Sequence, residues 1–223
     1  KFRRERGEYL VEGYKMVSEC IAAGMEVTAV ACTEEYSAYF PGAMIVSRAV
    51  FEYISDERTP QGVIASVRIP ANVIVRPHGR CILLDGLQDP GNVGTIIRTA
   101  NAAGYGQIYM INCADPFSPK CVRSSMSGVF FAEIMQGSAE EVLSALDGTP
   151  LVCADMNGEN AYNFRAPEKF CLCIGSEGSG LSSAVRGAAQ FTVKIPMRPT
   201  CESLNAAVSA GILMYLLHGA ERE

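Results

Sequence analysis

Three short segments of the chain combine glycines with side chains that could bind a ligand. In the first, Asp89 is a good N-cap and Pro90 suits the first position of a helix, so the free backbone N–H groups would form an anion site. Arg98 lies on the helix face of Gly91 and Gly94, and we expect its side chain to run over that bare surface toward a phosphate. The motif alone is equally consistent with a surface arginine paired to a carboxylate.

The second segment, Gly175–Leu181, follows a buried apolar run. It has three glycines, which let the backbone approach a ligand closely, and Glu177 is the one carboxylate among them. The order of the glycines differs from the dinucleotide-binding GxGxxG and from the P-loop, which disfavours a nucleotide triphosphate. A flexible surface turn is the alternative interpretation.

The third segment runs from Ile195 to Asn205 and precedes an apolar helix. Ser203 and Asn205 stand at the entrance of that helix, where short polar side chains commonly cap the backbone. Cys201 could be considered as a nucleophile, but neither histidine of the chain is a natural partner for it, so we disfavour thiol catalysis.

The segments are positioned by strands that alternate with helices. This pattern predicts a parallel sheet covered on both faces, with ligands bound at the carboxyl ends of its strands. The predicted strands are Cys81–Leu84, Gln107–Ile111, Ala132–Met135, Leu151–Ala154, Phe170–Ile174 and Thr192–Ile195. The predicted helices are Gly91–Ala103, Lys120–Met126, Ala139–Leu146, a short one from Ser182 and a closing one to His218.

The part of the chain before this alternation is organised differently. Its predicted elements are a helix over Val11–Ala23, a strand over Val27–Cys32, a helix from Ser47 through Ile54 and a strand over Gly62–Val67. Prolines and a glycine between residues 68 and 79 indicate a connector. We therefore predict two domains, at residues 1–75 and 79–223.

Composition excludes several classes of protein. With 223 residues, 48% hydrophobic and 19% charged, the chain can bury a core and is neither disordered nor fibrous. The net charge of −5 argues against a protein that grips nucleic acid by bulk charge, so any RNA must meet a local patch. Residues 1–80 carry equal numbers of acidic and basic side chains, and the densest basic cluster is Lys1, Arg3, Arg4 and Arg6.

Cysteine and histidine usage narrows the chemistry further. Nine cysteines, without CxxC spacing or a secretory leader, predict reduced thiols in a cytoplasmic protein. With two histidines and no metal-ligand spacing, we expect no metal site. No apolar run approaches the ~20 residues that span a bilayer, so we expect no membrane insertion.

In this order, the three segments resemble the signature motifs of the SpoU (TrmH-type) RNA ribose 2′-O-methyltransferases, of the SPOUT superfamily. The matching stretches are Asp89–Ala100, Gly175–Leu181, Ile195–Met197 and Glu202–Asn205. The resemblance also covers Ser118–Ser125, and the N-terminal part resembles the small RNA-binding domain of this family. It implies an α/β fold whose parallel sheet ends in a C-terminal trefoil knot, preceded by a small N-terminal α/β RNA-binding domain.

The resemblance also implies a cofactor, an assembly and a set of site residues. Members bind S-adenosylmethionine in the knot loops and act as homodimers through the knotted domain. By motif position, Gly175, Ile195, Leu204 and Ser203 would contact the cofactor. Arg98 would be the catalytic arginine, and the residues arranging it would be Asn92, Glu177, Ser203 and Asn205.

The implied function is transfer of a methyl group to a ribose 2′-hydroxyl of RNA, with ribosomal RNA favoured because of the N-terminal domain. We expect phosphate contacts from Arg3, Arg4, Lys120 and Arg123. Three alternatives stay open: a transfer RNA 2′-O-methyltransferase, a catalytically inactive RNA-binding module, and an enzyme acting on small nucleotides. The inactive module is suggested by residues 198–201, where relatives often have small residues including glycine.

Overall fold

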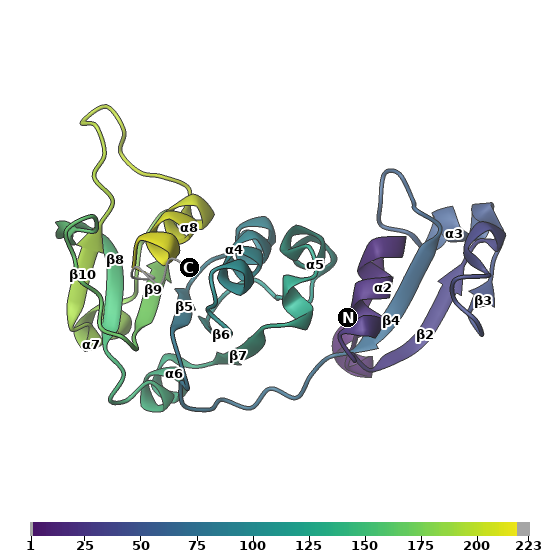
Figure 1. Cartoon of the computed structure of the whole chain (residues 1–223), viewed down its shortest axis with the longest axis horizontal. Coiled ribbons are helices and arrows are strands. Elements are labelled where there is room, and N and C mark those ends of the chain that lie inside the picture. Colours follow the sequence, from purple (N-terminus) through teal and green to yellow (C-terminus); the bar gives the residue numbers. More distant parts are fainter. Residues whose placement is uncertain (1, 218–223) are drawn as a thin grey trace.

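Two β-sheets organise the molecule, and each is built from a different stretch of the chain. The computed structural model describes residues 2–217. Figure 1 shows two lobes joined by an extended linker that runs from the end of the first sheet to the start of the second. Within the described residues, no helix has the length and apolar character to cross a membrane.

The N-terminal lobe contains a four-stranded sheet in the order β1-β4-β2-β3, in which β4 pairs antiparallel with both β1 and β2. Its elements are α1 (Phe2–Arg6), β1 (Glu8–Glu12), α2 (Tyr14–Ala22), β2 (Val27–Cys32), the 3₁₀ turn η1 (Glu34–Tyr36), β3 (Met44–Ile45), α3 (Arg48–Ile54) and β4 (Val63–Arg68). The predicted strand Val27–Cys32 and the helix after Ser47 are confirmed, and the Ser47 hydroxyl accepts the N–H of Val50 at 3.3 Å.

The predicted helix over Val11–Ala23 is wrong at its start. Tyr9 and Val11 are buried while Leu10 between them is exposed, which is the alternation of a strand with one face on a core. Gly13, with φ +99°, then ends the strand, and the helix begins at Tyr14. Because Val11 also fits a helical spacing with the residues after it, the sequence pattern alone favoured one longer helix.

The C-terminal lobe contains a six-stranded sheet in the order β10-β8-β9-β5-β6-β7, and every neighbouring pair is parallel. Its strands are β5 (Cys81–Asp85), β6 (Gln107–Ile111), β7 (Glu133–Gly137), β8 (Leu151–Asn160), β9 (Cys171–Gly175) and β10 (Phe191–Lys194). The helices and one 3₁₀ turn are α4 (Pro90–Ala102), α5 (Pro119–Ser125), η2 (Gly128–Phe130), α6 (Ala139–Ala145), α7 (Ser183–Ala188) and α8 (Ala206–Leu217). The parallel α/β arrangement predicted from sequence is therefore confirmed.

Both faces of this sheet are covered, as the continuous apolar strands require. Along β5, Ile82 and Leu84 join the core on the side of α4 and α8, while Cys81 and Leu83 join the core on the side of α6 and α7. All four side chains are completely buried.

The strand β8 is longer than predicted and runs to Asn160 instead of Ala154. Residues 155–160 are mostly polar, so they resembled a loop, but they pair with the edge strand β10 across a register shift. A Cβ on Gly158 would lie 2.5 Å from the backbone N of Val193, so this pairing depends on a glycine at that position.

The two lobes contact each other through α5 and the loop before it (Figure 1). The rings of Tyr9 and Phe117 lie 5.0 Å apart across the junction, and both side chains belong to one buried cluster that extends through the two lobes. Ion pairs flank this contact, at 2.5 Å between Arg3 and Asp115 and at 2.7 Å between Arg123 and Glu57.

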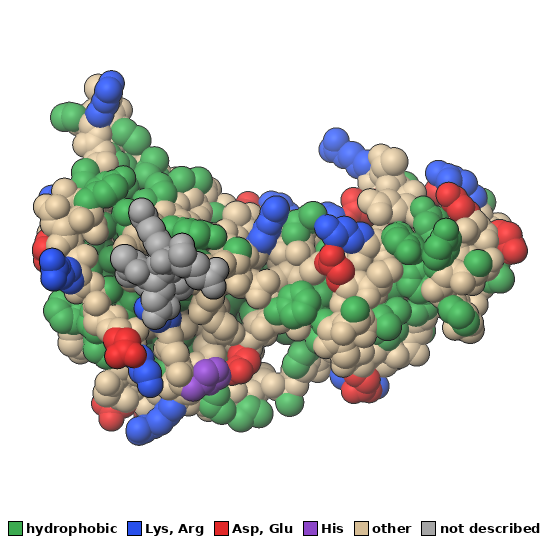
Figure 2. Space-filling view, in the orientation of Figure 1, with side chains coloured by type: hydrophobic (Ala, Val, Ile, Leu, Met, Phe, Trp, Pro, Cys, Tyr) green, Lys and Arg blue, Asp and Glu red, His purple; other side chains and the backbone are tan. Residues whose placement is uncertain are grey.

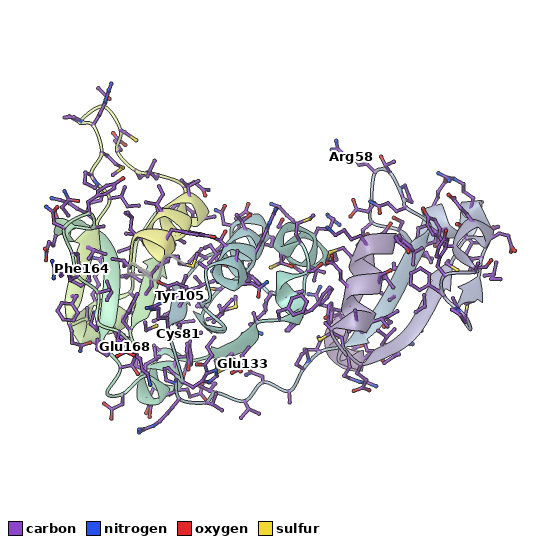
Figure 3. All side chains as sticks on the ribbon, in the orientation of Figure 1. Arg58, Cys81, Tyr105, Glu133, Phe164 and Glu168 are labelled. Carbon is purple, nitrogen blue, oxygen red and sulfur yellow. The ribbon has the colours of Figure 1, made fainter. Side chains whose placement is uncertain are left out.

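Two loops rise from the same side of the molecule, one from each lobe (Figure 1). One connects β10 to α8 and leaves the carboxyl edge of the parallel sheet. The other connects α3 to β4 and carries Arg58, which points away from the body (Figure 3). Figure 2 shows the surface hollowed between these two loops.

Candidate functional site

A cleft of about 930 Å³ opens at the carboxyl edge of the sheet, beside β8, β9 and β10. The four residues expected to bind the cofactor all line it: Gly175, Ile195, Ser203 and Leu204. Glu177 lies in the same wall. Segments two and three therefore meet at one ligand-sized cavity, at the place where parallel sheets of this kind bind ligands.

The glycine-rich segment is a hydrogen-bonded turn. Ser176 and Gly180 exchange two backbone hydrogen bonds, at 3.2 and 3.0 Å, and the hydroxyls of Ser176 and Ser179 are 2.8 Å apart. A Cβ on Gly175 would overlap the backbone of Gly180 and Leu181, so only glycine permits this closure. The turn thus presents its backbone to the cleft in a defined shape.

A polar chain connects all three segments. The amide nitrogen of Asn92 donates a hydrogen bond to Glu177, and its oxygen accepts one from Asn205 Nδ2 at 3.0 Å. Asn205 Oδ1 in turn accepts the backbone N–H groups of Ala207 and Val208, at 2.9 and 3.2 Å, and so caps α8. Three of the residues predicted to arrange the catalytic arginine are therefore in direct contact.

The start of α4 is fixed as the sequence predicts. Asp89 accepts the backbone N–H of Gly91 at 2.5 Å and that of Asn92 at 3.2 Å, and Pro90 occupies the first turn. The Lys120 ammonium lies 3.1 Å from Asp89. This bond, followed by the two backbone bonds, lowers the pKa of the Asp89 carboxyl below its ordinary value.

Arg98 is exposed on α4, and its side chain makes no hydrogen bond or ion pair within the described residues. The prediction that the Arg98 side chain runs over an uncovered surface at Gly91 and Gly94 is wrong. A Cβ on Gly94 would overlap the Cys121 carbonyl and lie 2.7 Å from Ser124 Cβ, so α5 covers this face. The glycines serve close packing between two helices, and the guanidinium of Arg98 stays free for a ligand.

The structure pairs most of the cations that we expected to meet RNA. Arg3 is bonded to Asp115, Lys120 to Asp89, and Arg123 to Glu57. Lys120 and Arg123 keep about half of their side chains exposed, at 55% and 44%. The side chain of Arg4 lies outside the described part of the structure.

Two features of the site were missed from the sequence. Asp85, only 5% exposed at the end of β5, accepts the backbone N–H of Ser182 at 2.6 Å and so anchors the exit of the glycine-rich turn. Arg186 of α7 reaches back to the Ser179 carbonyl at 3.4 Å and to Asp155 at 3.8 Å in the cleft wall. The signal for Asp85 was a carboxylate ending an otherwise apolar strand.

Cys113 and Cys121 are poorly suited to thiol chemistry, and the thiol that lines the cleft belongs to Cys201. Burial raises the pKa of Cys113 to about 11 and that of Cys121 to about 12, which keeps both thiols protonated. Among the described residues, no three His, Cys, Asp or Glu side chains come together in a way that could hold a metal ion.

Comparison with known families gives two adjacent matches. Residues 79–215 match the SpoU rRNA Methylase family, and residues 1–65 match the MRM3-like substrate binding domain. The chain is 29% identical to the 23S rRNA (guanosine(2553)-2′-O)-methyltransferase RlmP of Bacillus subtilis, over 98% of this chain and 92% of that protein. It is 32% identical to the 23S rRNA (uridine(2479)-2′-O)-methyltransferase of Streptomyces viridochromogenes, over 96% and 83%.

Solved structures show the same architecture. The SpoU methyltransferase AviRb from Streptomyces viridochromogenes, in complex with the cofactor AdoMet, superposes with a TM-score of 0.87 at 27% identity, covering 97% of this chain and 91% of that one. An AdoMet-bound rRNA methyltransferase from Sinorhizobium meliloti gives 0.87 at 27%, covering 96% and 88%.

Proposed function

This chain belongs to the SpoU rRNA methylase family, and from that premise we propose that it transfers a methyl group from S-adenosylmethionine to a ribose 2′-hydroxyl of ribosomal RNA. The observation that carries the proposal is the hydrogen-bonded chain Glu177–Asn92–Asn205, which joins all three signature segments beside one cleft. The named relatives support ribosomal RNA over transfer RNA, since two of them are 23S rRNA 2′-O-methyltransferases.

The cleft fits S-adenosylmethionine in size and in chemistry. Its volume of about 930 Å³ is within the range of small-molecule sites, and the bare backbone at Gly175 allows close approach by a ligand. It is lined by the carboxylates of Asp155, Glu177 and Glu202 and by the cations of Arg186, Lys194 and Arg198, which suits a ligand that carries a positively charged sulfur, an ammonium group and a carboxylate. We propose that Gly175, Ile195, Leu204 and Ser203 hold the cofactor.

The chain's own residues must position the ribose hydroxyl and remove its proton. When bound, the cofactor would supply a methyl group carried on a positively charged sulfur. Loss of the methyl group would leave that sulfur as a neutral thioether. Arg98 is locked in its charged form, so it does not accept the proton. Instead its free guanidinium orients the hydroxyl and the adjacent phosphate, and a phosphate oxygen takes the proton. Asn92, Glu177, Ser203 and Asn205 arrange the reaction site around it.

The N-terminal lobe, residues 1–75, is proposed to hold the RNA, and residues 79–223 to perform the reaction. We propose phosphate contacts from Arg3, Arg4, Lys120 and Arg123, of which Lys120 and Arg123 keep about half of their side chains exposed beside their carboxylate partners. The hollow between the two raised loops supports this path (Figure 2), because one of these loops, between β10 and α8, also lines the cleft. Such contacts fix the position of the RNA and carry no base information.

Three further proposals follow from family membership. The C-terminal segment forms a trefoil knot, two chains form a homodimer through the knotted domain, and the protein acts in the cytoplasm. The homodimer is supported by α8, where Val208 and Tyr215 are apolar yet 51% and 62% exposed in the single chain. Exposed apolar side chains on a buried helix favour a partner surface.

The proposal is tested with methyl-labelled S-adenosylmethionine and either ribosomal or transfer RNA, followed by nucleoside analysis. We expect 2′-O-methyl nucleosides from ribosomal RNA, and a loss of about a hundredfold or more in kcat for Arg98→Ala with cofactor affinity unchanged. Arg76→Ala is the control, since Arg76 is also an exposed arginine without an ion pair among the described residues. Absence of any 2′-O-methyl product, or full activity of Arg98→Ala, would contradict the proposal.

A further inference from the structure

The turn after α5 has an unusual backbone. Met126 and Ser127 are adjacent and have φ of +43° and +73°. Only one other non-glycine residue in the described part of the chain, Asn112, has a positive φ. Residues other than glycine rarely adopt a positive φ. Such a backbone conformation persists where surrounding contacts hold it, and it is often found at functional sites.

The turn lies directly against the helix of the reaction arginine. Gly128 follows Ser127, and a Cβ on Gly128 would be 3.1 Å from Arg98 Cα and 3.2 Å from Arg98 N. The backbone of the turn is thus packed against α4 at Arg98, whose side chain faces solvent. A shift of the turn would press on Arg98 or leave its backbone unsupported.

The same turn is bonded to the other lobe. Ser127 is 4% exposed, and its hydroxyl donates a hydrogen bond to the Glu19 carboxylate of α2, with Met16 Sδ 3.1 Å away. Glu19 and Met16 belong to the substrate-binding lobe. One hydroxyl therefore connects α2 with the turn that supports Arg98.

We infer that Ser127 is a positioning residue for the methyl transfer, because its bond to Glu19 sets the register between the substrate-binding lobe and Arg98. RNA held by the N-terminal lobe then presents its target ribose to Arg98 at a fixed distance. This inference rests on the proposed function and names a residue outside the signature segments. Without the bond, RNA still binds, but its ribose is presented less often in the reactive position.

Ser127→Gly tests the inference without straining the backbone, because glycine adopts positive φ readily and lacks the hydroxyl. We expect kcat to fall about fivefold or more while the KM for RNA and the Kd for S-adenosylmethionine stay within about twofold. Glu19→Ala should show the same loss. Glu19→Gln keeps an acceptor oxygen for the hydroxyl and should retain wild-type kcat within about twofold.

Two controls separate positioning from general stability. Ser66→Ala removes a serine–glutamate bond of 2.7 Å that lies within the N-terminal sheet, so it should leave kcat unchanged. Lys15→Gln removes the exposed ion pair of Glu19 with Lys15, at 3.7 Å, and should also leave kcat unchanged. The double variant Ser127→Gly with Glu19→Ala should lose no more than either single variant, because both remove one bond.

Wild-type kcat in Ser127→Gly, additive losses in the double variant, or failure of Glu19→Gln to rescue would each overturn the inference. These outcomes are distinct from failure of the proposed function. If the wild-type protein makes no 2′-O-methyl nucleoside, the function itself fails. If the wild type is active, Arg98→Ala is inactive and Ser127→Gly equals the wild type, the inference alone fails.

Discussion

Asn92 has a role that requires a side chain able both to donate and to accept a hydrogen bond. It donates to Glu177 with its nitrogen and accepts from Asn205 with its oxygen, so one side chain satisfies an acceptor and a donor from two other segments. The resemblance to the family's signature motifs identified all three residues, because each lies in a stretch that matches one of those motifs. It could not predict their contacts, since 85 and 113 positions separate Asn92 from its two partners.

Replacing Asn92 by alanine should uncouple the three segments. Alanine is the better helix former, so Asn101→Ala, at an exposed position of the same helix, serves as a control that gains the same propensity. Relative to that control, we expect Asn92→Ala to unfold with a free energy about 1–2 kcal/mol lower, because it loses two hydrogen bonds. Chemical denaturation measures the difference, and kcat should fall with it. Equal stability and kcat in the two variants would contradict this account.

Among the helices, the start of α4 is predicted correctly, whereas the role predicted for its glycines is wrong because α5 packs on them. Asp89 and Pro90 predicted the start of α4, and the structure confirms both cap and position. Gly91 and Gly94 suggested an open face, yet a glycine pair on one helix face equally permits a second helix to approach. Local spacing cannot distinguish the two, because the partner helix lies about thirty residues away along the chain.

Gly94→Ala should therefore disturb the packing of α5 on α4. The added Cβ would overlap the Cys121 carbonyl, and we expect a loss of about 1–3 kcal/mol in unfolding free energy despite a gain of about 1 kcal/mol in helix propensity. Gly187→Ala is the matched control, because Gly187 lies in α7 with no atom within 4 Å of its Cβ position. It should be neutral or stabilising. Thermal unfolding of both variants checks the prediction, and a stable Gly94→Ala would disprove the close packing.

The sequence was most informative about elements whose pattern is unambiguous. Both ends of the strand Gln107–Ile111 are predicted correctly. Its five residues are all buried, so the sequence pattern alone is enough to indicate the strand. Strand β1 was absorbed into a predicted helix, and the polar end of β8 resembled a loop. In both cases the strand forms because it pairs with a strand distant in the sequence. The spacing of apolar residues within the segment does not indicate that pairing.

Across the whole molecule, ion pairs connect the two lobes. Arg3, from the basic cluster expected to meet RNA, is bonded to Asp115 of the other lobe. Arg123 similarly bonds Glu57, close to the partly buried carboxylate of Glu12. The even charge balance of residues 1–80 thus conceals one cation, Arg3, and one anion, Glu57, that are already paired across the junction, which composition cannot reveal.

The junction should make stability depend on pH through Glu12. Burial raises the pKa of the Glu12 carboxyl above its ordinary value, and the nearby Glu57 and Asp56 add to this, although a bond from Ser55 and the charge of Arg123 oppose it. Because the folded-state pKa is the higher one, the contribution of Glu12 to stability is fully present below the ordinary pKa of 4.5 and is lost as pH rises through the raised value.

Glu12→Gln removes this titration and keeps an acceptor for Ser55. We expect the variant to gain stability relative to the wild type as pH rises from 4.5 to 7, with little difference below 4.5. Denaturant titrations across this pH range measure the difference. A constant difference at every pH would show that ionisation of Glu12 is not its cause.

The cysteine distribution has a practical consequence. Of the nine cysteines, Cys201 alone is exposed, and it lies in the wall of the cleft with its thiol 3.3 Å from the Ser203 carbonyl. The other eight are buried or partly buried, so a maleimide dye should modify one position without removal of any native thiol. The natural sequence therefore already contains an attachment point for a fluorescent reporter at the wall of the proposed cofactor cleft.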